Sequence, residues 1–449
     1  MLPAEFTARM QRLLGEEFDA FAACYDAPRH TALRLNPLKT GAPPDLSRFG
    51  LSPVPWARDG YYYDAQTRPG LSAYHDAGLY YLQEPSAMAP AMLLDAQPGE
   101  RVLDLCAAPG GKSTQLAAAM AGRGLLVCNE ISAKRAQILS SNIERMGIAN
   151  ALVLNEHPAR LAGRFAGFFD KILVDAPCSG EGMFRKEPLA AQEWTPGTPA
   201  MCAARQLEIL HSAAQMLRPG GRLVYSTCTF SAEENEGAVS AFLRAHPDFS
   251  VEQIPGTPFS PGRPAWVENP APDLEYTFRL WPHRLRGEGH YAAVLRRAGN
   301  EAPADVPIEP GAKLPKELLD FAKNTGVEIP DGKPVLFGQS VYLAPEELPR
   351  LAGLRVLRAG LQLGACKKGR FEPAHAWALW LKTAARTADF AENAPEIARY
   401  LAGETINGSQ TGWAIVRVDG LSLGWVKGSD GQLKNHYPKA LRRMGSQGV

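Results

Sequence analysis

Two cysteines follow short apolar segments in the middle of the chain. One lies in Asp175-Ala176-Pro177-Cys178-Ser179-Gly180 and the other in Tyr225-Ser226-Thr227-Cys228-Thr229. Both come where a predicted strand ends, and open parallel sheets bind ligands outside the carboxyl ends of their strands. A free cysteine is often only a core residue, and either one alone would suit that interpretation. Both together, beside Asp175, favour a crevice that holds two thiols and a carboxylate.

Such thiols suit covalent catalysis on a pyrimidine ring. Carbon 5 of cytosine is a poor nucleophile toward a methyl sulfonium, but a thiolate added to carbon 6 makes the ring an enamine whose carbon 5 can attack. Ring nitrogen 3 must be protonated or hydrogen-bonded meanwhile, and a carboxylic acid such as Asp175 can provide this. The proton on carbon 5 must leave before the thiol is eliminated, and a second thiol or water can help. On these grounds either cysteine could be the nucleophile.

A turn of small residues lies upstream, between a predicted strand and the start of a helix. Small residues let the backbone approach a ligand closely. The turn has no GxGxxG pattern, and Cys106 stands where a GxxxxGK[ST] phosphate loop has its first glycine. A nucleoside triphosphatase, or a turn that binds nothing, is therefore the weaker alternative. The candidate ligand-binding residues of the turn are Cys106, Ala107, Ala108, Pro109, Gly110, Gly111 and Lys112.

An acidic residue, Glu130, follows the second predicted strand, 20 residues after Gly110. A carboxylate at this offset can accept hydrogen bonds from both hydroxyls of an adenosine ribose. Because the turn lacks the features of a phosphate loop, the combination indicates S-adenosylmethionine rather than a dinucleotide. Arg135 and Asp175 complete the expected cofactor contacts.

Strand and helix patterns alternate between residues 97 and 230. Five short apolar runs, typical of strands buried on both faces, span 101–105, 125–128, 151–154, 171–174 and 222–225. Between them, Ser132 can cap a helix that reaches Met146, and Ser231 with Glu234 forms a capping-box signature for another. This alternation predicts an α/β fold with a Rossmann-like, doubly wound sheet.

The two ends of the chain differ from this central region. We expect a small N-terminal α+β domain over 1–75 that binds RNA, with a helix at 5–21, and a central domain over 76–298 that holds the candidate cofactor site and the two thiols. A Pro-rich linker at 301–307 introduces a C-terminal α+β module over 299–449. In that module, Asp419-Gly420 between two apolar runs is a strong signal for a β-hairpin.

The composition restricts the possible classes of protein. The 449 residues carry a formal net charge of +1, so attraction to a polyanion must come from local clusters. Seven cysteines with no CxxC spacing support neither a zinc site nor disulfides. We therefore expect no metal and a reduced, cytoplasmic setting. No segment approaches the ~18 apolar residues of a membrane span. We also expect a monomer.

The motifs together resemble those of the Nop/Sun-type RNA cytosine-5 methyltransferases. The similar pieces, between about residue 30 and 297, are Arg34 to Lys39, Tyr81 to Met88, Leu103 to Ser113, Asn129-Glu130, the two cysteine segments and Leu217 to Gly221. The resemblance implies an S-adenosylmethionine-dependent methyltransferase sheet. It also implies that Cys228 is the nucleophile and that Cys178 helps to break down the adduct. Relatives often hold the adenine with an Asp after the third strand, where this chain offers Asn155, or else Glu156.

The C-terminal module is similar to that of the F-type bacterial small-subunit ribosomal RNA methyltransferases. The resemblance lies in Gly424-Trp425-Val426-Lys427 and Leu433-Lys434-Asn435-His436-Tyr437-Pro438. It implies a PUA-like RNA-binding module and 16S ribosomal RNA, alone or within the small subunit, as the partner. The alternatives are the same chemistry on tRNA, or a non-catalytic RNA-binding ribosome-assembly protein. The latter would be expected to lack Asp175 or one of the two thiols.

Basic residues gather in two places that could hold RNA. Six basic residues and no acid lie between Arg350 and Arg370, with aromatic residues nearby in the sequence. Single-stranded RNA is commonly held by attraction to its phosphates together with base stacking. A target cytosine within a helix would have to be flipped out. The candidate RNA contacts are Lys367, Lys368 and Arg370 in the module, and Arg185, Lys186 and Arg205 near the thiols.

Overall fold

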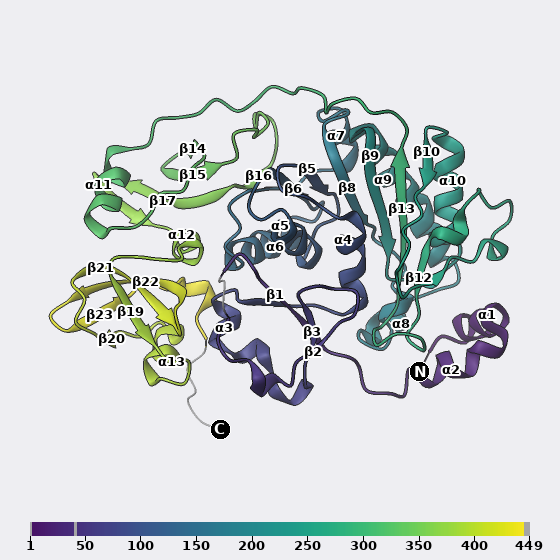
Figure 1. Ribbon diagram of the computed structural model, residues 1–449, viewed down its shortest axis with the longest axis horizontal. Coiled ribbons are helices and arrows are strands. Elements are labelled where there is room, and N and C mark those ends of the chain that lie inside the picture. The colour runs from purple at the N-terminus through teal and green to yellow at the C-terminus, as the bar shows by residue number, and fades with distance from the viewer. Residues whose placement is uncertain (1, 40–42, 444–449) are drawn as a thin grey trace.

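A ten-stranded mixed sheet forms the centre of the molecule. The computed structural model describes residues 2–39 and 43–443 (Figure 1). The main path of the sheet runs β11-β12-β13-β9-β8-β5-β6-β7-β16, and β10 pairs with β13. Its parallel strands are β5 Arg101–Asp104, β6 Leu125–Asn129, β7 Ala151–Leu154, β8 Phe169–Asp175 and β9 Leu217–Thr227. The others are β10 Phe249–Val251, β11 Ser260–Pro261, β12 Phe278–Leu280, β13 His290–Arg297 and β16 Val356–Ala359. The predicted doubly wound α/β fold is confirmed.

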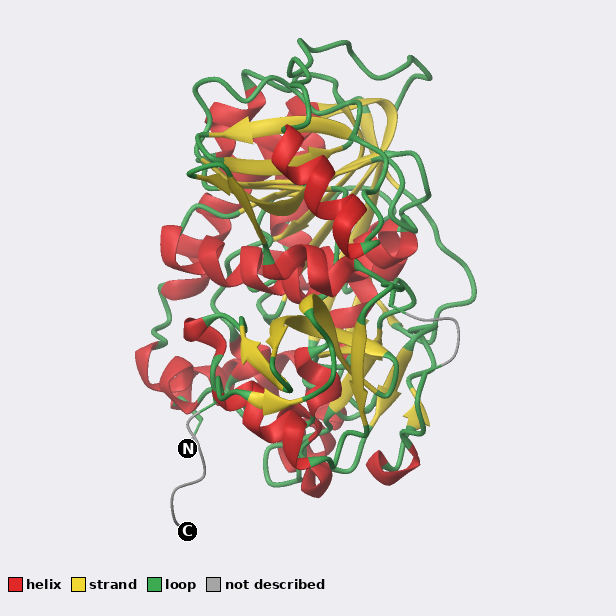
Figure 2. Ribbon diagram, turned by 90° about the vertical axis from the view of Figure 1, so that its left-hand side faces the viewer, coloured by secondary structure: helices red, strands yellow, loops and turns green. Residues whose placement is uncertain are grey.

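Helices cover both faces of this sheet, which explains the continuous apolar runs of its strands. One face carries α4 Ala89–Leu94, α5 Gly111–Ala119 and α6 Ala133–Arg145; the other carries α7 Pro158–Ala162, α9 Thr198–Met216 and α10 Ala238–Ala245. Leu139 and Ile143 of α6 belong to the first core, and Leu210 and Phe242 to the second. All five residues of β6 are buried, as expected for a strand covered on both sides. Figure 2 shows the helices on either side of the strands.

The N-terminal region has two parts. The helix predicted over 5–21 is interrupted, because Gly15 adopts a left-handed φ of 54° between α1 Ala4–Leu14 and α2 Phe18–Ala23. A four-stranded sheet follows, made of β2 Ser52–Pro53, β3 Gly60–Tyr62, β1 Ala32–Leu35 and β4 Tyr80–Leu82, with α3 at Ala73–Asp76. Since β4 pairs with β1, this sheet continues past residue 75, where the sequence suggested a boundary.

The C-terminal region contains two further sheets. The first unit has α11 Lys316–Thr325, β14 Lys333–Phe337, β15 Ser340–Ala344, β17 Leu361–Lys367, β18 Arg370–Pro373 and α12 His375–Trp380. The second has β19 Thr387–Phe390, α13 Pro395–Ala402, β20 Ile406–Asn407, β21 Gly412–Val418, β22 Leu421–Ser429 and β23 Gln432–Asn435. The predicted hairpin is present, with Asp419 and Gly420 both at positive φ between β21 and β22.

One C-terminal strand belongs to the central sheet. β16 runs antiparallel to β7, where Ala359 faces Leu152. Arg358 of this strand is buried and forms an ion pair with Glu144 of α6. The region after residue 299 is therefore more than a separate module, because it supplies an edge strand of the central domain. In the part of the chain that the structure describes, no helix is long and apolar enough to cross a membrane.

Candidate active site

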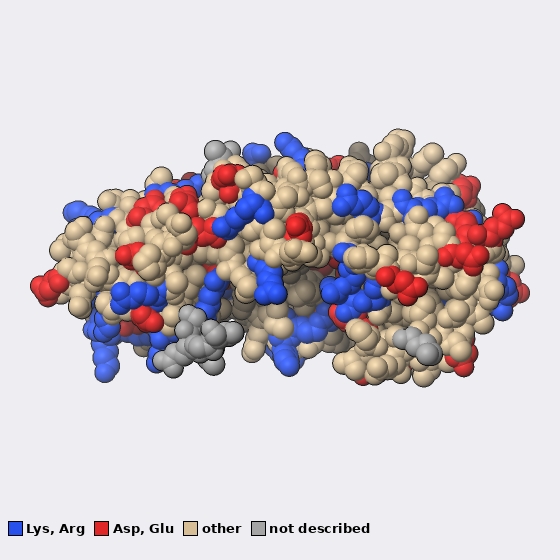
Figure 3. All heavy atoms as spheres, turned by 90° about the horizontal axis from the view of Figure 1, so that it is seen from below, with Lys and Arg blue, Asp and Glu red and all other residues tan. Residues whose placement is uncertain are grey.

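A cavity of about 1330 Å³ opens at the carboxyl ends of β5, β6, β8 and β9. Most of the candidate site residues line it: Cys106, Ala107, Ala108, Pro109, Gly111, Lys112, Glu130, Arg135, Asp175, Cys178 and Cys228. Seen from below, the molecule is hollowed near its middle, and Lys and Arg side chains gather around the hollow (Figure 3). Residues that are far apart in the sequence therefore share one pocket, as the positions of the strand ends predict.

The two glycines of the turn, Gly110 and Gly111, have different roles. Gly110 has a left-handed φ of 113° at the start of α5 and shapes the turn without lining the cavity. Gly111 lines the cavity, where a Cβ would lie 3.3 Å from the Tyr81 ring. From the N-terminal sheet, the buried Arg34 donates hydrogen bonds to the Gly111 carbonyl (3.2 Å) and to Thr114 Oγ1 (2.7 Å). The N-terminal region thus braces the turn.

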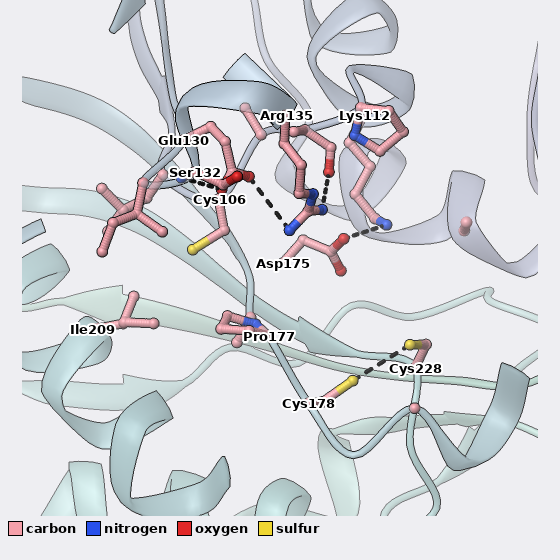
Figure 4. Close-up of a pocket in the computed structure, with 18 of the residues that line it drawn as sticks. Cys106, Lys112, Glu130, Ser132, Arg135, Asp175, Pro177, Cys178, Ile209 and Cys228 are labelled. Carbon is pink, nitrogen blue, oxygen red and sulfur yellow. Dashed lines mark hydrogen bonds and ion pairs between the residues drawn. The ribbon is translucent and has the colours of Figure 1, made fainter. Parts of the chain in front are cut away.

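Glu130 is held at the end of β6 with one oxygen still largely free. It is only 3% exposed, and its Oε1 accepts a hydrogen bond from the Ser132 N–H at 2.9 Å. Its Oε2 makes one longer contact, 3.6 Å from an Arg135 nitrogen. Arg135 also donates to the Ala108 carbonyl at 2.7 Å, so it links the turn to the carboxylate (Figure 4). Glu130 can therefore accept hydrogen bonds from the hydroxyl groups of a ligand.

Asp104 is a pocket residue that the sequence analysis missed. It ends β5, and its Oδ2 accepts a hydrogen bond from Ser113 Oγ at 2.6 Å. Its Oδ1 is buried and has no partner among the described residues. Burial raises the pKa of this carboxyl to about 7. An unsatisfied buried carboxylate oxygen suits a ligand that brings a positively charged donor. Its place at the end of a predicted strand, directly before the turn, was the available signal.

Asn155 does not occupy the ligand-binding position predicted for it. Its amide donates to the backbone carbonyls of Glu130 (2.7 Å) and Ile131 (2.8 Å), and it does not line the cavity. Its alternative, Glu156, is also absent from the cavity wall and accepts a hydrogen bond from the Arg355 N–H at 2.8 Å. Asn155 therefore fixes the end of β6, and the cavity wall at this point begins with His157.

Asp175 is an ionised partner of Lys112. The Lys112 ammonium lies 2.7 Å from its Oδ2, and Ser226 Oγ donates to its Oδ1 at 2.7 Å. Burial alone would raise the pKa of Asp175, but the nearby Lys112 ammonium opposes burial, and the pKa lies well below the usual range. The free protein therefore carries a carboxylate here, not the carboxylic acid expected from the sequence. Lys112 is also committed to this pair, which argues against a phosphate-loop lysine.

The two candidate thiols lie side by side. Cys178 follows β8, Cys228 follows β9, and their sulfur atoms are 3.3 Å apart (Figure 4). The hydrogen bond to Cys228, together with burial, raises the pKa of Cys178 well above its ordinary value. A thiol with a raised pKa keeps its proton, so Cys178 can donate a hydrogen bond to the Cys228 sulfur.

Glu234 holds the loop that carries Cys178. The predicted capping box is half formed, since the Glu234 N–H donates to Ser231 Oγ at 3.3 Å. The carboxylate turns instead to the thiol loop, where it accepts hydrogen bonds from the Ser179 N–H (2.9 Å) and Gln206 (2.8 Å). Burial raises its pKa to about 7. Sequence spacing could not reveal this contact, which joins residues 55 positions apart.

The candidate RNA contacts have different surroundings. Lys186 and Arg205 are exposed and line the cavity. Arg185 is withdrawn instead, since its guanidinium is 2.8 Å from the buried Glu288 and also donates to the Cys24 carbonyl. We therefore assign Arg185 to holding α2 rather than RNA. Lys367, Lys368 and Arg370 are exposed at the β17–β18 hairpin, and two of them, Lys367 and Arg370, share the carboxylate of Glu372.

Four family models match successive parts of the chain. Residues 91–296 match the model described as 16S rRNA methyltransferase RsmB/F, and residues 2–85 match the N-terminal domain of 16S rRNA methyltransferase RsmF. Residues 320–381 match the first C-terminal domain of that methyltransferase, and 387–443 match its PUA domain. The chain belongs to the RsmB/F methyltransferase family. Its likeness to this family therefore covers both flanking regions as well as the sheet.

Individual relatives agree with this assignment. Ribosomal RNA small subunit methyltransferase F of Erwinia tasmaniensis is 32% identical over 99% of this chain and 97% of its own length. The enzyme of the same name from Vibrio cholerae is 33% identical over 98% of both. A methyltransferase homolog protein from Pyrococcus horikoshii is a solved structure with a TM-score of 0.56 and 27% identity, covering 66% of this chain and 100% of its own. NSun6 from Pyrococcus horikoshii with SFG, at 23% identity and TM-score 0.56 over 66% of this chain and 99% of its own, shares the fold.

Proposed function

We propose that this methyltransferase uses S-adenosylmethionine to form 5-methylcytosine in 16S ribosomal RNA, through an adduct between Cys228 and cytosine carbon 6. One observation carries the proposal: two thiols 3.3 Å apart stand beside an ionised carboxylate in the cavity that also contains the glycine-rich turn. A methyl transfer to an ordinary nucleophile such as oxygen or nitrogen needs no thiol. A ring carbon that must first be activated does need one.

The cavity fits S-adenosylmethionine, which would supply a methyl group on a sulfonium. Glu130 offers a carboxylate oxygen for the ribose hydroxyls, and the unpartnered Asp104 Oδ1 offers an acceptor for the amino group of the methionine part. Cys106, Ala107 and Ala108 present small side chains and backbone to the ligand. A cavity of about 1330 Å³ also leaves space beside the cofactor for a nucleotide.

The thiol pair supports different roles for its members. Cys228 attacks carbon 6 as the thiolate, while Cys178 keeps its proton and hydrogen-bonds to the attacking sulfur. After methyl transfer Cys178 must release its own proton to water; its thiolate then takes the carbon 5 proton, and the electron pair of that C–H bond re-forms the ring double bond as the Cys228 sulfur leaves carbon 6. The ionised Asp175 accepts a hydrogen bond from nitrogen 3 once that atom has gained its proton.

The RNA substrate is proposed from the flanking regions. The relatives are named as methyltransferases of small-subunit ribosomal RNA, and residues 387–443 match the PUA domain of the RsmF enzyme. We assign RNA holding to the N-terminal and C-terminal regions, and to Lys186 and Arg205 at the cavity. A tRNA substrate is the second candidate. A non-catalytic assembly role is disfavoured because Asp175 and both thiols line one cavity.

The decisive experiment maps 5-methylcytosine in ribosomal and transfer RNA from cells with and without the protein. Loss of the mark from 16S ribosomal RNA alone is the expected result. Loss from tRNA would transfer the proposal to the second candidate, and no change in any RNA would refute cytosine methylation. In parallel, RNA containing 5-fluorocytosine should trap the protein in a complex that survives a denaturing gel, because fluorine cannot leave as a proton does.

A further inference from the structure

A buried imidazole in the cavity wall remains without a role. His290 begins β13 and is 5% exposed, yet it lines the cavity. Its Nε2 has no hydrogen-bond partner among the described residues, although Asp175 Oδ1 lies 3.7 Å away. Buried polar atoms are rarely left unsatisfied without a reason. The atom is therefore a candidate for a group that works during the reaction.

The surroundings of His290 hold the ring in one orientation. Its Nδ1 lies 3.1 Å from the Gly289 carbonyl, which can only accept, so Nδ1 carries the hydrogen and a neutral ring has its lone pair on Nε2. No larger residue fits at position 289, because a Cβ there would lie 2.4 Å from the Phe230 ring. The preceding Glu288 N–H donates to Glu84 Oε1 at 2.8 Å. Nε2 of the neutral ring is thus a buried proton acceptor, and the nearest charged group is the Asp175 carboxylate, 3.7 Å away.

The sheet places this acceptor next to the nucleophile. In the antiparallel pair of β9 and β13, Tyr291 faces Thr227. His290 precedes Tyr291 and Cys228 follows Thr227, so the same register would place His290 opposite Cys228. Directly opposed residues lie on the same face of a sheet. Asp175, from β8 on the other side of β9, pairs in register with Ser226. The imidazole, the thiol and the carboxylate therefore come from three adjacent chain segments.

The proposed reaction needs such an acceptor. As the sulfur bonds to carbon 6, the thiol must lose a proton and nitrogen 3 must gain one. Asp175 has no proton to give, because Lys112 keeps it ionised. Cys178 keeps its own proton to hydrogen-bond to the sulfur. His290 Nε2 is the remaining unpartnered acceptor at this end of the cavity among the described residues.

We propose that His290 is a catalytic proton carrier that takes the Cys228 proton and passes it through Asp175 to cytosine nitrogen 3. The S–H bond breaks as N–H forms on Nε2, and the sulfur electron pair forms the bond to carbon 6. The ring electrons move to nitrogen 3, which receives the proton from the imidazolium by way of the Asp175 carboxylate. No proton is gained or lost overall. The inference rests on the proposed function.

The neighbouring charged groups are compatible with this role. Asp175 stabilises an imidazolium at Nε2, while Lys112 lies on the other oxygen of that carboxylate. The Cys178 and Cys228 thiols line the same cavity as His290 and are the other titratable groups that follow β8 and β9 there. Glu288, just before β13, forms an ion pair with Arg185. Glu84, which follows β4, accepts hydrogen bonds from the backbone N–H groups of Ala87 and Glu288.

The test measures how fast the full-length protein forms the covalent complex with 5-fluorocytosine RNA. His290→Phe fills a similar volume without a proton acceptor, and His290→Gln serves as a second variant that keeps a polar side chain. Both should slow adduct formation by about 10²- to 10⁴-fold, the usual contribution of a positioned base. The deficit should shrink as the pH rises, because hydroxide can then remove the thiol proton. Binding of S-adenosylhomocysteine reports whether each variant is folded.

The matched control is Tyr291→Phe, one residue further along β13, which removes a hydroxyl outside the cavity wall. It should trap RNA at the wild-type rate. If a folded His290 variant also does so, or if its deficit is the same at every pH, the proton-carrier role is refuted. If the wild type itself forms no adduct, the proposed function fails and this inference fails with it.

Discussion

The single cavity has two ends that treat their charges differently. At the end beside β5 and β6, the proposed cofactor end, charged side chains form hydrogen bonds with the backbone: Glu130 accepts one from the Ser132 N–H, and Arg135 donates one to the Ala108 carbonyl. At the thiol end, beside β8 and β9, reactive side chains meet each other, as in the Lys112–Asp175 and Cys178–Cys228 pairs. Backbone partners give a rigid binding shape. Side-chain pairs can exchange protons, which suits chemistry rather than recognition alone.

Two aspartates make the same contrast on adjacent strands. Asp104 and Asp175 are the last residues of β5 and β8. Burial raises the pKa of Asp104 to about 7, because its one strong partner is a hydroxyl. Burial acts on Asp175 too, but the Lys112 ammonium reverses the outcome and its pKa falls. The position of one lysine therefore decides which of the two carboxyls is ionised before any ligand arrives.

The largest expected effects come from the two cysteines at the thiol end. Cys228→Ala removes the nucleophile, so methylation and the trapped complex should both disappear. Cys178→Ala should still attack and transfer the methyl group but release the product slowly, so a covalent protein–RNA complex should accumulate with ordinary RNA. Denaturing gels would separate the outcomes. Accumulation in Cys228→Ala instead of Cys178→Ala would exchange the two roles.

Asp104→Asn tests the carboxyl that has no counter-ion. Between its unfolded pKa of 3.8 and its folded value of about 7, the folded state holds a proton that the unfolded state has lost. Wild-type stability from this group therefore falls as pH rises through that interval, by about 4 kcal/mol at most. Asp104→Asn should lack this loss. Denaturant unfolding of both proteins without cofactor, at about pH 5 and about pH 8, would measure it. An equal pH dependence in both proteins would contradict the shifted pKa.

Glu130→Ala tests the cofactor end directly. Loss of a charge-assisted acceptor for the ribose should weaken S-adenosylmethionine binding by about 1.5–3 kcal/mol, or about 10- to 150-fold. Glu156→Gln is the matched control, since Glu156 lies two residues after the neighbouring strand β7 but does not line the cavity. Calorimetry should show an effect only in the first variant. Equal affinities in Glu130→Ala and the wild type would remove Glu130 from the binding site.

The structural features that could be predicted from the sequence were those that depend on local sequence patterns. Buried parallel strands are apolar runs, so β5 to β9 could be found, and the residues that follow strand ends identified the thiols and the turn. β16 could not be found, because Arg358 interrupts its short apolar pattern. Its burial depends on polar partners far away in the sequence, Ser140 and Glu144. The prediction of one continuous helix over 5–21 was wrong at Gly15, because the apolar periodicity does not reveal its positive φ.

Side-chain direction limited the prediction of the site. The offset of Asn155 from the third strand was suitable for a ligand contact, but spacing does not reveal that its amide points at two backbone carbonyls. The charge of Asp175 depends on Lys112, 63 residues earlier. Protonation states follow from such distant contacts, so the sequence could indicate which groups meet but not which of them carries the proton.

The smallest expected effect concerns two lysines outside the cavity. Lys427 and Lys434 face each other directly across β22 and β23, and Trp413 faces Lys427 from β21. Like charges in facing positions destabilise a sheet, and neither lysine forms an ion pair within the described residues, whereas Lys367 lies 2.7 Å from Glu372. A phosphate between the two lysines would relieve the repulsion.

Changing both lysines to alanine should therefore reduce the salt dependence of RNA binding more than Lys367→Ala does. Each lost phosphate contact lowers the slope of log affinity against log salt by about 0.7 for a single strand, so the double variant should lose about 1.4. Lys367→Ala should lose less, because Glu372 already neutralises that charge. Titrations at several salt concentrations give both slopes. If the double variant keeps the wild-type slope, RNA does not contact this face of the C-terminal sheet. The facing lysines then only destabilise the sheet.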